Sequence, residues 1–155
     1  MITVKVIIDV SKVKILPIEL EAAYQVASNL RSDDLRECVE GHGIVPIIDI
    51  PLASLRGFCR YFKVPNGETA GMVGIQDSKI WMLCTPAIEK YPLTFAREAK
   101  RFINSRTEPL LWNVVDQRNT EHIKLLKFLG FTFHEELLFG PNNLPFIKFS
   151  KQWIH

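Results

Sequence analysis

The sequence has 155 residues, of which 47% are hydrophobic, with 19 basic and 17 acidic side chains. This length is typical of one compact domain, so we expect residues 1–155 to form a single domain. A formal net charge of +2 gives little general attraction for phosphates, and nucleic-acid binding is therefore not expected. No apolar run approaches the roughly 18 residues that span a bilayer, which argues against a membrane protein.

The cysteine pattern gives no sign of a disulfide framework or a metal site. Cys38, Cys59 and Cys84 are odd in number and have neither CxxC spacing nor a histidine cluster. His134 precedes two glutamates, but adjacent residues of a strand point to alternate faces. We therefore expect no bound metal and a reducing, cytosolic environment.

The first third of the chain predicts one strand followed by helices. Residues 2–8 are rich in β-branched side chains and are expected to form a strand. Apolar residues three or four apart over 20–27 predict a helix, and a second short helix is expected over 34–41, capped by the polar pair at 32–33. Residues 44–56 contain two prolines and predict no element clearly.

The rest of the chain predicts a hairpin followed by alternating helices and strands. Pro65, Asn66 and Gly67 form a turn sequence between two strand-like segments, which are expected to pair in antiparallel fashion. The other expected elements are strands over 79–85, 110–115 and 131–135, a last strand within 140–149, a helix from Pro92, and a helix from Asn119 or Thr120 to Leu129, ended by Gly130.

The segment VVDQRNTEHIKLLKFLGFTF carries a resemblance to a known family. It resembles the last conserved block of the GNAT (Gcn5-related N-acetyltransferase) superfamily, in which a buried strand leads through an Asn to a helix ending in Leu-Gly-Phe. The matching residues are Asn119, Leu129, Gly130 and Phe131, and the predicted order of elements agrees. The resemblance implies an α/β (α+β) fold with a mixed, mainly antiparallel central sheet of about six to seven strands, flanked by about four helices.

Residues 68–150 resemble one branch of this superfamily more closely, the small GNAT-like proteins encoded by bacteriophages. That branch includes a protein associated with internal virion proteins. The resemblance implies phage virion proteins or a host protein as partners, and a location in the host cytoplasm or in the virion. It does not indicate an oligomeric state.

The resemblance also implies acetyl-coenzyme A (acetyl-CoA) as the acyl donor of an N-acetyltransferase. The pyrophosphate loop of the family is rich in glycine, whereas residues 85–92 contain no glycine and two prolines. A helix Tyr of the family is replaced by Leu126. The residues implied to contact the cofactor are Cys84, Thr85, Lys90, Arg97 and Asn119.

Each of these residues also has a purely structural interpretation. Cys84 can be a buried thiol, Asn119 can cap its helix, and Lys90 and Arg97 can belong to a solvated face. His122 is expected to be an exposed helix residue.

The candidates for catalysis are Glu68 and Asp116 as general base and Tyr91 as the acid that protonates the thiolate. The carboxylates can equally be solvated ends of strands, and Tyr91 can cap its loop. Two functions are favoured: an N-acetyltransferase with a degenerate pyrophosphate loop, or an inactive GNAT-like protein that serves as a virion component or binds a host protein. Nucleic-acid contact through the basic face from Arg97 to Arg106 is a third, weaker alternative, because base-stacking aromatics are not interleaved there.

Overall fold

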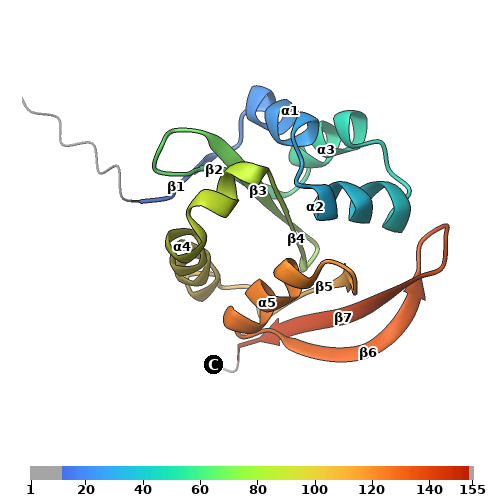
Figure 1. Cartoon of the computed structure of the whole chain (residues 1–155). Coiled ribbons are helices and arrows are strands. Elements are labelled where there is room, and N and C mark those ends of the chain that lie inside the picture. Colours follow the sequence, from blue (N-terminus) through green and yellow to red (C-terminus); the bar gives the residue numbers. More distant parts are fainter. Residues whose placement is uncertain (1–11, 154–155) are drawn as a thin grey trace, which may run out of the picture.

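The computed structural model describes residues 12–153, which form a mixed α/β fold (Figure 1). The described residues contain seven strands in one sheet and five α-helices, where about four helices were expected. The predicted fold class is confirmed. The strand expected over 2–8 lies outside the described residues.

The sheet is antiparallel except at one place. Its strands are β1 (Lys14–Pro17), β2 (Phe58–Lys63), β3 (Thr69–Gln76), β4 (Lys79–Cys84), β5 (Leu110–Asp116), β6 (Thr132–Phe139) and β7 (Leu144–Gln152). Their order across the sheet is β1-β2-β3-β4-β5-β7-β6, and only β4 and β5 are parallel neighbours. The predicted hairpin is confirmed, because β2 and β3 pair from Phe58↔Ile75 to Lys63↔Thr69.

The helices lie on both faces of the sheet. They are α1 (Leu20–Ser28), α2 (Ser32–Arg36), α3 (Pro46–Ser54), α4 (Pro92–Asn104) and α5 (Thr120–Phe128), with a π-helical turn η1 (Glu37–Gly41) and a 3-10 turn η2 (Pro86–Lys90). Side chains of α1 and α3 pack with β2 and β3 on one face. Side chains of α4 and α5 pack with β3, β4, β5 and β7 on the other.

Two predictions for the first half need correction. The second helix is not capped by a side chain at 32–33: it begins at Ser32, after Arg31, and makes no side-chain cap hydrogen bond. Residues 44–56, which predicted no clear element, contain α3, which starts at Pro46 because the fixed φ of proline suits a first helical turn.

The continuous helix formed by α2 and η1 buries its polar face and exposes its apolar one. Its buried residues are Asp34, Glu37, Cys38 and Gly41, at the spacing of one helical face, whereas Leu35 and Val39 on the opposite face are 43% and 46% exposed. Charged residues are almost never buried unless they have partners. This helix therefore places two carboxylates inside the protein for a reason other than packing.

We predict that the contact of η1 with the β6–β7 turn is sensitive to one added carbon. Gly140 has φ +76°, and a Cβ there would overlap the carbonyl oxygen of Gly41. Gly140→Ala should cost about 1–2 kcal/mol for the left-handed backbone and a further 1–3 kcal/mol for the collision. Gly67→Ala is the matched control, since Gly67 also has positive φ but has open space around it. Equal losses in urea unfolding would contradict the prediction.

Candidate active site

The parallel strands β4 and β5 pair at one position and then diverge (Figure 1). The single pair in register is Lys79↔Trp112, where the Trp112 N–H donates to the Ser78 carbonyl at 3.0 Å. Beyond this pair, β4 and β5 have no further residues in register. The sheet is thus split between two buried strands, and the backbone groups along the split need other partners.

Three residues of β4 direct their backbone polar groups into this split. Two pairs show which positions of the β3–β4 hairpin are hydrogen-bonded to each other. Gln76 pairs with Lys79 across a two-residue turn, and at the far end the Thr85 N–H donates to the Ala70 carbonyl. Because hydrogen-bonded positions alternate along an antiparallel pair, Ile80, Met82 and Cys84 point their N–H and C=O groups away from β3 and toward β5.

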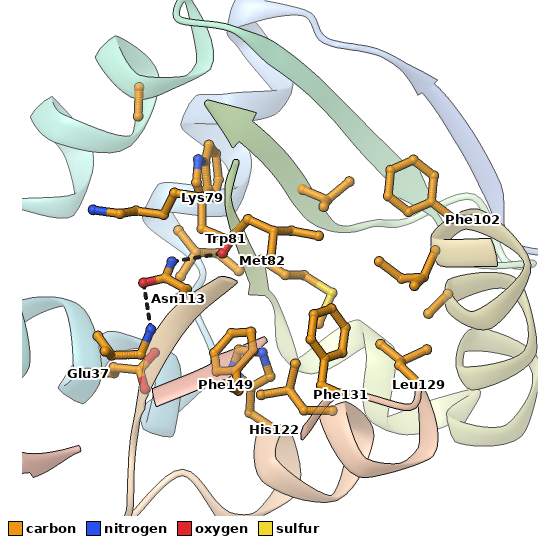
Figure 2. A pocket seen from close by; sticks show the side chains of 18 of the residues that line it. Glu37, Lys79, Trp81, Met82, Phe102, Asn113, His122, Leu129, Phe131 and Phe149 are labelled. Carbon is orange, nitrogen blue, oxygen red and sulfur yellow. Dashed lines mark hydrogen bonds between the residues drawn. The ribbon is translucent and has the colours of Figure 1, made fainter. Parts of the chain in front are cut away.

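Asn113 closes the narrow end of the split. Its side-chain amide donates to the Ile80 carbonyl at 2.7 Å, and its side-chain oxygen accepts from the Val114 N–H at 2.7 Å (Figure 2). One side chain therefore replaces the next rung of the ladder on both strands. A divergence that would leave two buried groups unpaired is in this way made stable.

The wide end is closed by α2 and η1. The Cys84 N–H donates to the Asp34 carboxylate and its carbonyl accepts from the Arg31 N–H, both at 2.9 Å. On the other strand, the Asp116 N–H donates to Glu37 Oε1 at 2.6 Å. Met82, between Asn113 and Asp34, lies where the two strands have separated and lines the cavities there.

Two cavities meet at the split. The first, which we call the slot cavity, has a volume of about 340 Å³ and passes from Glu37 and Lys79 between the strands toward α4 and α5 (Figure 2). The second, the side cavity, has a volume of about 300 Å³ and lies between α4 and α5 beside Cys84. Met82, Phe95 and His122 line both cavities. Volumes near 300 Å³ are within the range of small-molecule sites.

The ionisable groups of the slot cavity have shifted pKa values. Burial raises the pKa of Glu37 to about 8, and the nearby Asp34 and Asp116 charges add to this, although the hydrogen bond from Asp116 opposes it. Burial lowers the pKa of His122, which is therefore neutral at pH 7. The site thus holds a carboxyl group that titrates near neutral pH beside an uncharged imidazole.

Of the residues implied to contact a cofactor, only Cys84 lines one of the two cavities. Thr85 is buried and its hydroxyl accepts from the Ala87 N–H, which starts η2. Lys90 forms an exposed ion pair with Glu68 at 3.1 Å, and Arg97 is exposed on α4. The structure does not bring these five residues together.

The side chains of Asn119 and His122 make contacts that differ from those expected from the sequence. Asn119 occupies the N-cap position of α5, but its side chain caps nothing: it donates to Asp34 at 2.9 Å and accepts from Arg31 at 3.4 Å. The expected exposed His122 is wrong, because its ring lines both cavities. Arg31 and Asp34 come from a distant segment that the sequence pattern could not place beside α5.

The catalytic candidates lie apart. Glu68 is exposed, and its hydrogen bond from Lys90 lowers its pKa. Asp116 is buried at the end of β5; burial tends to raise its pKa, but the hydrogen bonds and charge of Arg118 outweigh burial and lower it. Tyr91 precedes α4 and lines neither of the two cavities.

Sequence reasoning missed Glu37 and Asn113. Glu37 reads as an ordinary acidic residue of a helix, because Leu35 and Val39 suggest that the opposite face is buried. Asn113 stands in an otherwise apolar strand, LLWNVV. A lone amide in a strand buried on both faces is the one signal that could have pointed to the split.

The segment that would hold a diphosphate differs from a glycine loop in structure as well as in sequence. Residues 86–90 form the 3-10 turn η2, and α4 then begins at Pro92, which has no N–H. Among the described residues, two basic ones line the side cavity: Arg31, which is paired with Asp34 at 2.9 Å, and Lys124, which is paired with Glu121 at 3.2 Å. Any diphosphate would depend on such side chains.

Comparison with known families gives one match. The family described as "Bacteriophage T7, probable scaffold protein Gp13" matches residues 65–138, just under half of the chain. No curated protein sequence matches.

Solved structures share the architecture closely. A GNAT-family acetyltransferase from Bacillus anthracis superposes with a TM-score of 0.66 at 10% identity, covering 91% of this chain and 95% of that one. YncA from Salmonella typhimurium, with its cofactor acetyl-CoA, gives 0.66 at 14% identity over 94% and 96%. Spermidine N-acetyltransferase from Vibrio cholerae, in complex with CoA and spermine, gives 0.64 at 10% identity over 92% and 96%. The chain has the GNAT fold.

No group of three or more His, Cys, Asp or Glu side chains within residues 12–153 is arranged to hold a metal ion. Within the same range, no helix has both the length and the apolar character needed to cross a membrane.

We predict that Glu37 makes the stability of the protein fall as pH rises. In the unfolded chain Glu37 ionises near pH 4.5, but the folded protein holds its proton up to about pH 8. Unfolding therefore becomes easier between these pH values, by up to about 4–5 kcal/mol at roughly 1.4 kcal/mol per pKa unit. Glu37→Gln cannot ionise, so its stability advantage over the wild type should grow between pH 5 and 8.

Urea unfolding at several pH values measures this difference. Glu40→Gln is the matched control, since Glu40 lies on the same helix but is exposed. Its stability difference from the wild type should stay constant over the same pH range. Parallel pH profiles for wild type and Glu37→Gln would refute the assignment of a raised pKa to Glu37.

Proposed function

We propose that this protein is an acyltransferase of the GNAT type, which moves an acyl group from a coenzyme A thioester to an amine. One observation carries the proposal: β4 and β5 separate around Met82, and two cavities meet there. Such a split is costly, because every backbone group along it needs a new partner. The chain maintains it with Asn113 on one side and with Asp34 and Glu37 on the other.

The residues at the split fit a thioester arm in part. The side cavity offers a path between α4 and α5, and the N–H and C=O of Met82, which point away from β3, would offer one rung of strand-like hydrogen bonding. A second rung, at Cys84, is already occupied by Arg31 and Asp34. Lys124 would supply charge for a diphosphate in place of the missing glycine loop.

Glu37 is the proposed general base. With a pKa of about 8, Glu37 is ionised in a fraction of the molecules at pH 7 and in most of them above pH 8; in that form its carboxylate, which lines the slot cavity, accepts the amine proton. The amine nitrogen bonds to the acyl carbon as the bond from that carbon to sulfur breaks. The amine proton passes to Glu37 and then to water, and the released thiolate takes a proton from water. His122 is neutral and offers a hydrogen bond where the two cavities meet.

We predict that acetyl-CoA binds through the side cavity and that filling this cavity blocks it. Ala96 on α4 lines the side cavity, so Ala96→Trp should weaken binding at least tenfold by occupying the path of the arm. Leu93→Trp is the matched control, because Leu93 lies on the same helix, is 71% exposed and lines neither cavity. Calorimetry measures both, and thermal unfolding checks that the variants are folded. No binding to the wild type at millimolar acetyl-CoA would exclude the proposal.

A second function is favoured by a separate feature, the apolar surface of residues 35–55. We infer that this surface docks onto another protein of a phage particle. Seven of its large apolar side chains are exposed: Leu35, Val39, Val45, Ile47, Ile48, Leu52 and Leu55. Ile48, Leu52 and Leu55 are spaced four and three residues apart along α3 and its C-cap and so share one face, and contiguous exposed apolar side chains mark interaction sites. The match to the phage scaffold-protein family supports this second role.

We predict that charges on this surface prevent incorporation into particles. Ile48→Glu combined with Leu52→Glu should abolish incorporation, because both side chains are half exposed and would be buried by a partner. Leu93→Glu is the control, since Leu93 is 71% exposed on α4, which packs on the opposite face of the sheet from α3. Mass spectrometry of particles of the phage that carries the gene measures the amounts. Particles that lack the wild-type protein would rule out this role.

A further inference from the structure

The slot cavity is larger and more apolar than an acetyl group needs. We call its part on the side of α4 and α5 the apolar chamber, which is lined by Phe102, Ile103, Leu126, Leu129, Phe131 and Phe149. Figure 2 shows Phe102, Leu129 and Phe131 pointing into this space, with Met82 at its entrance. The polar residues Glu37, Lys79 and Asn113 lie at the opposite end of the cavity.

Among residues 12–153, the one carboxylate beside the chamber is paired. Glu98 on α4 lines the cavity, but its carboxylate is paired with Arg101 at 2.6 Å. His122 stands at the entrance and is neutral at pH 7. Water in such a space would find few hydrogen-bond partners, which favours an apolar ligand.

The volume sets the length of the group that fits. A methylene takes up about as much space as a water molecule in the liquid, roughly 30 Å³. The methyl end of an acetyl group would leave most of the 340 Å³ empty. A chain of about six to eight carbons occupies roughly half to two-thirds of that volume, which leaves room for the reacting amine at the Glu37 end.

We propose that the donor is a medium-chain acyl thioester, whose hydrocarbon tail lies in the apolar chamber. This inference rests on the proposed acyltransferase function and specifies its substrate. The thioester is held at Met82 and His122, where the side cavity and the slot cavity meet, so that the tail enters the chamber and the carbonyl faces Glu37. The bonds made and broken are those of the transfer described above, and the chain length changes none of them.

Binding of acetyl-CoA, hexanoyl-CoA and octanoyl-CoA to the full chain tests the inference by calorimetry. Affinity should rise about three- to fourfold for each methylene that enters the chamber. Octanoyl-CoA binding no tighter than acetyl-CoA would overturn the medium-chain inference and leave the acyltransferase proposal standing. Binding of none of the three would remove both.

A variant locates the tail. Ala99 on α4 lines the slot cavity but not the side cavity, so Ala99→Phe should reduce octanoyl-CoA affinity at least tenfold and leave acetyl-CoA affinity within twofold. Leu93→Phe, on the exposed side of the same helix, should change neither. If Ala99→Phe fails to fold, the change of wild-type affinity with acyl-chain length tests the inference instead. Equal losses for both thioesters in a folded Ala99→Phe would place the tail elsewhere and contradict the inference.

Discussion

The arrangement of this protein depends on how it satisfies the backbone groups that two diverging strands leave unpaired. A buried N–H or C=O without a partner costs about 1–3 kcal/mol, so a split between central strands cannot exist unless side chains replace the missing rungs. Asn113 does this on both strands at the narrow end. Asp34 and Glu37 do it at the wide end, one for each strand.

This requirement explains the unusual orientation of α2 and η1. The helix buries carboxylates because Cys84 and Asp116 need hydrogen-bond acceptors, and Leu35 and Val39 are turned outward as a result. Arg31 and Asn119 complete the hydrogen bonding of Asp34, which keeps a buried charge paired. Glu37 has no such cation within hydrogen-bond reach among residues 12–153, and its burial raises its pKa. The same geometry creates an apolar surface on the outside and a titratable carboxyl group within.

Structural and functional demands meet at these positions. A carboxyl group with a pKa of about 8 destabilises the folded protein at neutral pH. A cavity of about 340 Å³ also lacks the van der Waals contacts that side chains filling it would make. Natural proteins retain such features mainly at functional sites. The backbone N–H of Cys84 is already bonded to Asp34 of α2, and a 3-10 turn stands in place of a glycine loop. In both respects this split differs from a site that holds its ligand mainly through backbone groups.

The sequence by itself determined the local elements and their order from the β2–β3 hairpin onward. Turn residues such as Asn66 and Gly67, the Pro at the start of α4 and the Gly130 that ends α5 act within a few residues, so their effects can be read from the chain. The motif of Asn119, Leu129, Gly130 and Phe131 indicated the fold, because it joins a buried strand to a helix of known type. These signals are local and need no knowledge of distant partners.

Only the tertiary structure decided the site. Whether Asn119 caps a helix or binds Asp34, and whether Glu37 faces solvent or the split, depends on contacts across about 80 residues of sequence. Hydrophobic patterning predicted the opposite face of α2 and η1, since it weighs burial but not the hydrogen bonds that Cys84 and Asp116 require. A polar residue becomes part of this site when the backbone of another strand lacks a partner, and that need arises only once the strands have been brought together and have diverged.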